Sequence, residues 1–196
     1  HGPSTLPGHQ LLVDLDELVR CGWLSPRSDH GFESNRCDFE RVAPYRRGRL
    51  REAWQGFLQK VQPADWSDFE RFRAQQSHWL EGYVLFMALE ARHGKPWTQW
   101  PAALAQCEPG ALADLAAQMT DDLGFFRFIQ WRFHLQWQRL REYAHQRGVL
   151  IVGDAPIFVA HHSADVWMNA AQYCLDAQGE PTVVAGVPPD HFSVTG

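Results

Sequence analysis

The sequence predicts an α/β fold in which helices predominate and a short strand follows them. Apolar residues recur at helical spacing over much of residues 1–148, and Leu123–Trp137 is apolar on nearly every face. Gly148 then precedes Val149–Val152, a continuous apolar run typical of a parallel strand covered on both faces. Asp154 follows two residues later. Because α/β barrels place functional groups at the carboxyl ends of their strands, this pattern predicts part of a ligand site.

The first predicted elements are a short helix, a loop and a longer helix. Asp14 can cap the short helix, with Glu17 three residues on as in a capping box and Gly22 beyond its end. Ser25–Ala43 is polar and is expected to form a loop. Arg47–Val61 carries apolar residues on one face and is predicted to be helical.

Two further helices have clear boundary signals. Ser67 and Glu70 form a capping-box pattern that predicts the start of a helix, and His93–Pro96 contains the Gly and Pro that end it. Pro109–Met119 is rich in alanine and begins with a proline, which favours the first turn of a helix.

The aromatic segments are expected to be structural. Asp121 or Asp122 opens the last long helix, which ends at Gly148; a helix that is apolar all round must be surrounded by protein. Trp97 and Trp100 could form a sugar platform, but we expect them to pack between helices.

The last quarter of the chain contains two short local structures. Ser163 is expected to cap a turn that contains Trp167. Tyr173–Asp176 and Pro181–Val184 read as the arms of a hairpin, in which Gly179 supplies a positive φ.

Three long strings in this quarter resemble the 4-alpha-glucanotransferases, also called amylomaltases or disproportionating enzymes. They are Gly153–Ala160 (Gly-Asp-Ala-Pro-Ile-Phe-Val-Ala), Ser163–Trp167 (Ser-Ala-Asp-Val-Trp) and Pro181–Asp190 (Pro-Thr-Val-Val-Ala-Gly-Val-Pro-Pro-Asp), followed by Phe192–Ser193 and Thr195–Gly196. Weaker matches upstream are Gln76–Glu81, Phe86–Leu89, Pro96–Pro101 and Phe128–Trp131. Together the matches cover the chain from about Leu11 onward.

The resemblance implies a mainly helical fragment of a (β/α)8 TIM barrel with helical insertions. Residues 1–148 would be insertion and barrel-wall helices. Residues 149–196 would be a barrel strand, a hairpin and a glucan-binding loop in which the chain stops, so we expect an internal fragment of the enzyme.

The implied reaction moves α-1,4-glucan segments between maltooligosaccharides by a retaining double displacement. Such a mechanism needs two carboxyl groups roughly 5–5.5 Å apart. In the family they lie in Arg-x-Asp-His and Ala-Glu-Asp motifs further along the chain. This sequence has no Ala-Glu-Asp string, and Arg27–His30 (Arg-Ser-Asp-His) lies in a polar loop too early in family order. We therefore expect no catalytic carboxylates and no activity from this chain alone.

The resemblance places five residues at the glucan: Asp154, His191, Phe192, Ser193 and Gly196. Asp154 either acts in the site, where it bonds sugar hydroxyls or positions a catalytic neighbour, or caps the turn that follows it, and these roles stay open. Prolines stiffen the loop before His191 and Phe192, so their flat rings can meet a sugar at little entropic cost. The family usually has Tyr at the position of His191, so the inference is firmer for Phe192.

A metal or other cofactor is not expected. His161 and His162 could suggest an unrelated metal hydrolase together with Asp154, but adjacent histidines diverge and no third His or Cys has ligand spacing. Asp165 is better explained by the turn after Ser163. The family also uses no metal.

Composition and charge bear on the partners and the location that we expect for the protein. A net charge of −5 gives no electrostatic reason to expect nucleic acid or a membrane as partner. Four scattered Cys and no signal peptide suggest the cytoplasm. The expected partner is a maltooligosaccharide, and a lone barrel strand would favour self-association of the fragment. The alternative function is a stand-alone helical carbohydrate-binding or interaction module without catalysis.

Overall fold

The structure is a computed structural model that describes residues 6–27, 31–32, 38–94, 96–153, 158–183, 186, 188–189 and 191. Its contacts divide the chain into two compact units. The first, here called the α7 unit, consists of Leu6–Val84 and Met119–Gly153. The second, the Trp167 unit, consists of His1–Thr5, Leu85–Gln118 and Asp154–Gly196. No helix in the described part of the chain is both long and apolar enough to span a membrane.

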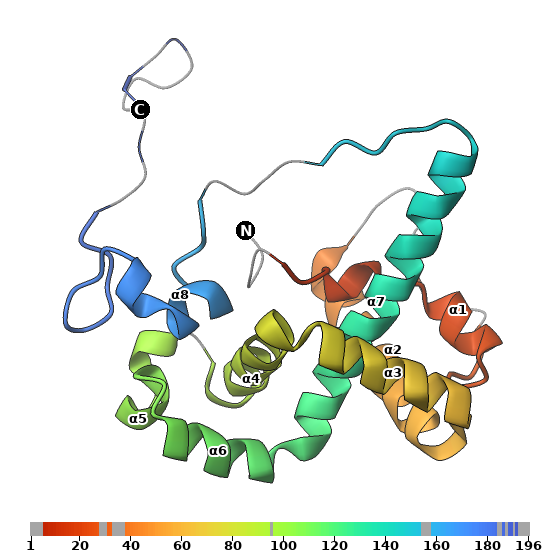
Figure 1. Cartoon of the computed structure of the whole chain (residues 1–196), viewed down its shortest axis with the longest axis horizontal. Coiled ribbons are helices and arrows are strands. Elements are labelled where there is room, and N and C mark those ends of the chain that lie inside the picture. The colour runs from red at the N-terminus through yellow and green to blue at the C-terminus, as the bar shows by residue number, and fades with distance from the viewer. Residues whose placement is uncertain are drawn as a thin grey trace. The chain divides into compact units, whose positions relative to one another are not determined.

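The α7 unit is built around one long helix. Figure 1 shows α3 crossing α7, and α7 contacts both α2 and α3. The elements of this unit are η1 (Gln10–Leu12, a 3₁₀ turn), α1 (Leu15–Arg20), α2 (Phe39–Lys60), α3 (Pro63–Gln75), the first half of α4 (Ser77–His93) and α7 (Thr120–Gln146).

A cluster of aromatic rings forms the core of the α7 unit. Phe57 of α2 is fully buried at its centre. Around it lie Trp23, Trp54, Trp66, Phe69, Phe128 and Trp131, with ring centroids 5.0–5.9 Å from that of Phe57. Edge-to-face and offset ring pairs each add about 0.5–1.5 kcal/mol beyond the burial of their area. This cluster therefore holds α2, α3 and α7 together.

The long helix confirms in part the prediction that Leu123–Trp137 is enclosed by protein. Residues 123–126 and 128–132 are buried, whereas residues 133–136 are half-buried and Trp137 is 39% exposed. The helix begins at Thr120, so Asp121 and Asp122 lie in its first turn rather than at its cap. Gly148 follows its end with φ +69°, the left-handed conformation that glycine adopts at no steric cost.

The predicted cap of the first helix is confirmed for Asp14 but not for Glu17. The Asp14 side chain accepts a hydrogen bond from the Asp16 N–H, and Gly22 has φ +76°. Glu17 does not close a capping box. Its carboxylate turns inward and pairs with Arg132, which is 3% exposed, and with Arg139 at 2.8 Å. A buried guanidinium needs a paired charge, and this demand overrides the local capping signal.

Two predicted boundaries in this unit were wrong. Helix α2 begins at Phe39, inside the predicted Ser25–Ala43 loop, because the Asp38 side chain caps it by accepting from the Arg41 N–H. The pattern at Ser67 is not a helix start either. Helix α3 already begins at Pro63, whose fixed φ suits the first helical position, and it ends at Gln75 so that α4 is a separate helix.

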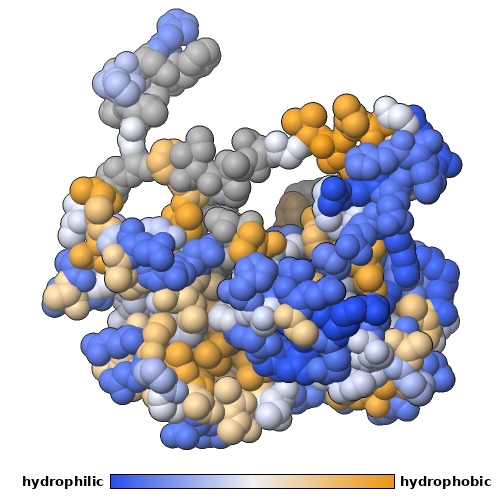
Figure 2. Space-filling model, in the orientation of Figure 1, coloured by the Kyte–Doolittle hydropathy of each residue, from blue (hydrophilic) through white to orange (hydrophobic). Residues whose placement is uncertain are grey.

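The predicted barrel strand was also wrong as a local structure. Val149–Val152 is neither a strand nor buried; its four side chains are 41–92% exposed. Figure 2 shows this hydrophobic segment standing at the surface after α7. A barrel strand needs neighbours on both edges for its backbone hydrogen bonds and layers on both faces, and the described residues supply neither.

The Trp167 unit is a small helical unit around three indoles. It contains the second half of α4, η2 (Trp97–Gln99), α5 (Ala102–Ala105), α6 (Pro109–Gln118), α8 (Ala164–Met168) and η3 (Ala170–Gln172). Trp97, Trp100 and Trp167 are 1–5% exposed, which confirms that the first two pack structurally. Their indole N–H groups donate to the carbonyl oxygens of His161, Gly94 and Leu104, respectively, at 2.7–2.9 Å.

The predicted helix start at Pro109 and the predicted cap at Ser163 are confirmed. Pro109 opens α6, and Ser163 caps α8 by accepting from the Val166 N–H at 3.3 Å.

Candidate functional site

Most of the predicted glucan-binding residues lie outside the described part of the chain. Asp154, Phe192, Ser193 and Gly196 are among them, so their roles stay predictions. His191 is described and is exposed. The structure therefore does not test whether these residues meet at one site.

The predicted hairpin that precedes this loop is confirmed only for its turn and one bridge between its arms, and Val184 lies outside the described residues. Leu175 and Pro181 form an antiparallel bridge, and the Asp176 carboxylate accepts hydrogen bonds from the Gln178 and Glu180 N–H groups at 2.9 Å. Gly179 has φ +84°, as predicted. The turn thus fixes the point from which the loop departs.

Three contacts anchor this turn to the rest of the Trp167 unit. A Cβ on Gly179 would lie 2.8 Å from the Trp97 ring, so the ring and the turn fit together only because this residue is glycine. The Thr98 hydroxyl donates to Glu180 at 2.9 Å, and His161 Nε2 lies 2.7 Å from the Gly179 carbonyl oxygen. This positioning role of His161 and Trp97 depends on contacts between distant residues and has no local signal in the sequence.

The two adjacent histidines have different surroundings, as expected of neighbours along a chain. His162 packs against the Phe86 ring at 5.2 Å, and its Nε2 lies 3.4 Å from a carboxylate oxygen of Glu90. Within the described ranges no group of three or more His, Cys, Asp or Glu side chains is arranged to hold a metal ion.

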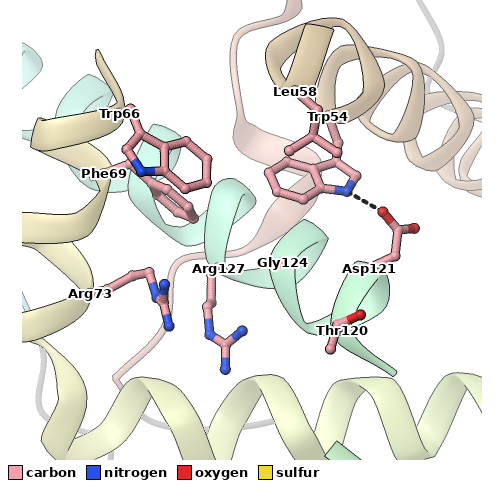
Figure 3. A pocket seen from close by; sticks show the side chains of 9 residues that line it. All are labelled: Trp54, Leu58, Trp66, Phe69, Arg73, Thr120, Asp121, Gly124 and Arg127. Carbon is pink, nitrogen blue, oxygen red and sulfur yellow. Dashed lines mark hydrogen bonds between the residues drawn. The ribbon is translucent and has the colours of Figure 1, made fainter. Parts of the chain in front are cut away.

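The α7 unit contains a hollow with a volume of about 360 Å³ between α2, α3 and α7 (Figure 3). We call it the Trp66 hollow. Its lining residues are Trp54 and Leu58 from α2, Trp66, Phe69 and Arg73 from α3, and Thr120, Asp121, Gly124 and Arg127 from α7.

Two walls of the Trp66 hollow are aromatic. Figure 3 shows Trp66 and Phe69 on one side and Trp54 on the other. Trp66 keeps 40% of its surface exposed, whereas Trp54 and Phe69 are 4% and 2% exposed. Trp66 is backed by Phe57, with ring centroids 5.9 Å apart and planes 20° apart. The Trp66 ring therefore exposes apolar surface to solvent, while its packing against Phe57 holds it in place.

The third wall carries two guanidinium groups, which lie beside each other in Figure 3. Each is matched by a carboxylate. Arg73 Nη1 donates to both Glu70 oxygens at 2.8 and 2.9 Å, and Arg127 donates through Nε at 3.1 Å and through Nη2 to Glu81. Arg73 Nε is buried and has no hydrogen-bond partner among the described residues.

Asp121 lines the far edge of the hollow and holds the Trp54 indole. Asp121 accepts a hydrogen bond from the Trp54 indole N–H at 2.8 Å (Figure 3) and lies 3.3 Å from Arg51. A Cβ on Gly124 would lie 2.6 Å from the Trp54 ring, so a glycine is required for this ring to lie against α7. The indole is therefore held on two sides.

A second hollow of about 330 Å³ lies elsewhere in the α7 unit. Trp79, Phe133, His134 and Trp137 contribute rings to it, and Gln130 exchanges two hydrogen bonds of 2.9 Å with the backbone of Gly8 at its edge. Burial lowers the pKa of His134 below its ordinary value, although the Asp68 carboxylate opposes this shift. This shift favours the uncharged form of the His134 ring.

The comparisons with known proteins agree along the whole chain. The family profile described as 4-alpha-glucanotransferase matches residues 1–196. This chain belongs to the 4-alpha-glucanotransferase family. A 4-alpha-glucanotransferase of Thermus thermophilus is 41% identical over 194 residues, covering 98% of this chain and 39% of the relative. The corresponding enzyme of Synechocystis is 39% identical over 198 residues, covering 98% of this chain and 39% of the relative.

A solved structure shows the same similarity. The chain matches an amylomaltase from Streptococcus agalactiae in complex with acarbose, with a TM-score of 0.89 and 29% sequence identity. The match covers 98% of this chain and 40% of the amylomaltase. This 4-alpha-glucanotransferase chain thus spans about two fifths of the proteins that it resembles.

Proposed function

We propose that this chain is part of a 4-alpha-glucanotransferase that moves α-1,4-glucan segments between maltooligosaccharides. The observation that carries the proposal is the family match over all 196 residues. The names of the relatives and the acarbose complex of the related amylomaltase support an oligosaccharide as the substrate.

The proposed reaction is a double displacement with retention. One carboxylate attacks the glucan, and a second carboxyl group first protonates the leaving oxygen and then activates the acceptor, at a separation of roughly 5–5.5 Å. We assign both groups to parts of the whole enzyme other than these 196 residues, which lack an Ala-Glu-Asp string. Arg27, the first residue of the only Arg-x-Asp-His string, instead lies 3.3 Å from Glu52 at the surface.

The chain's own contribution is part of the glucan cleft. Asp154, His191, Phe192, Ser193 and Gly196 are the residues that we propose contact the sugar. The anchored turn at Gly179 supports this assignment, because a fixed base limits the entropy that the following loop loses on binding.

The proposed architecture of the whole enzyme is a (β/α)8 barrel. In it, Val149–Val152 would gain strand neighbours, and the exposure of this apolar run in the present chain supports that placement.

The test compares two proteins on maltotriose. The 196-residue chain and a protein translated from the same gene beyond Gly196 are each incubated with maltotriose, and the products are separated by chain length. The extended protein should release glucose and longer maltooligosaccharides, and the short chain should not. Products from the short chain would overturn the assignment of the carboxylates. Binding without products from the extended protein would favour the stand-alone binding module.

A further inference from the structure

We propose that the Trp66 hollow binds a short segment of α-1,4-glucan, as a second sugar site made of residues other than those of the predicted loop. The choice of glucan rests on the proposed function. The hollow itself is described by its own contacts, so the two claims can fail separately.

The charge balance of the hollow selects a neutral ligand. Arg73 is paired with Glu70 and Arg127 with Glu81, and Asp121 faces Arg51. An anion such as phosphate would meet a carboxylate beside every guanidinium and would gain little net attraction. Guanidinium–carboxylate pairs present donors and acceptors side by side, which is what sugar hydroxyls require.

The apolar surface of the hollow fits a sugar ring. Sugars expose flat C–H faces, and the 40%-exposed Trp66 ring offers a flat surface that Phe57 supports from behind. Because the Trp54 indole is fixed by Asp121 and the close approach of Gly124, little freedom would be lost on binding. The volume of about 360 Å³ lies at the lower end of small-molecule sites, roughly 300–1,000 Å³.

The guanidinium groups of the hollow favour a ligand with acceptor oxygens. The Arg73 side chain is 34% exposed, although its Nε atom is buried and out of reach of a ligand. Sugar hydroxyls can replace the water contacts of an exposed guanidinium, whereas an apolar helix laid into the hollow would bury that group without replacing them.

The test is a titration of the 196-residue chain with maltotetraose, followed by calorimetry and by the indole N–H resonances of tryptophan. Trp66→Ala should weaken binding at this site at least about tenfold, and Trp66→Phe should retain binding within about threefold because a flat ring remains. Trp137→Ala is the matched control, since that indole is 39% exposed in the other hollow. The Trp66→Phe spectrum assigns the Trp66 resonance, which should shift on titration even if the alanine variant does not fold.

The outcomes separate the two proposals. The inference is wrong if maltotetraose leaves the Trp66 resonance unmoved, if Trp137→Ala removes the binding instead, or if inorganic phosphate shifts that resonance and maltotetraose does not. If Phe192→Ala weakens binding while both Trp66 variants bind normally, the loop site is supported and the Trp66 hollow is not a sugar site. If the chain binds no maltooligosaccharide at all, both sugar sites are refuted.

Discussion

The close approach of α2 to the chain at Trp23 gives a quantitative prediction. A Cβ on Gly56 would lie 1.9 Å from the Trp23 carbonyl oxygen and 2.7 Å from its carbonyl carbon. Side-chain and backbone atoms essentially never approach so closely, so Gly56→Ala must push the two backbones apart.

The expected loss follows from two opposing effects. Alanine gains about 1 kcal/mol over glycine within a helix. Overpacking costs typically about 1–3 kcal/mol, and the upper value applies because the obstacle is backbone, not the end of a flexible side chain. Trp23 also cannot yield easily, since its ring packs edge-on against Phe57 at 5.0 Å. We therefore expect a net loss of about 2 kcal/mol in the free energy of unfolding of the α7 unit.

The same helix supplies the control. Gly48 is exposed, and nothing lies within 4 Å of the Cβ that an alanine would add there. Gly48→Ala should therefore stabilise the chain by about 0.5–1 kcal/mol. Urea unfolding followed by circular dichroism measures both variants. Shifts of the same sign and size at the two positions would refute the reasoning, because helix propensity alone would then explain them.

Three further predictions follow from buried groups and exposed surface. Glu17→Gln removes the charge opposite buried Arg132 and should lower the free energy of unfolding in urea by about 3 kcal/mol. Arg20→Ala breaks an exposed pair and should lower it by under about 1 kcal/mol. Equal losses would contradict the buried pairing. Burial raises the pKa of the Cys107 thiol to about 11. Iodoacetamide at pH 8 should therefore alkylate this residue at least about a hundredfold more slowly in the folded chain than in urea. Comparable alkylation rates, measured by mass spectrometry, would be inconsistent with that burial. The exposed segment around Leu150 should drive self-association of the chain. Light scattering at rising protein concentration should then show an increasing mass, and Leu150→Lys should reduce this increase. A constant monomer mass would disprove the prediction.

Helix ends with local signals were predictable from the sequence. Asp14, Pro109 and Ser163 act where they were expected, because a cap or a first-turn proline depends on residues within one helical turn. Ser67 misled for the same reason: its pattern is local, but Pro63 had already begun the helix. The break at Gln76 carries neither glycine nor proline, so no local signal marked it.

Structures that depend on distant residues were not predictable. Val149–Val152 has the composition of a buried strand, but a strand exists only with neighbours that satisfy its backbone. The Trp66 hollow is made by three helices, and its polar groups come from Arg73 and Arg127, which belong to no sequence motif that marks a site. Gly124 within an aromatic helix was the one available hint, since a glycine there marks a close packing contact.

The central claim is that this chain recognises α-glucan while the chemistry resides elsewhere in the enzyme. One experiment addresses it directly: the purified 196-residue chain is titrated with maltotetraose, and the sugar recovered from the same sample is analysed by mass. The account predicts saturable binding with the maltotetraose recovered unchanged. Recovery of shorter and longer maltooligosaccharides, or the absence of any binding, would contradict it.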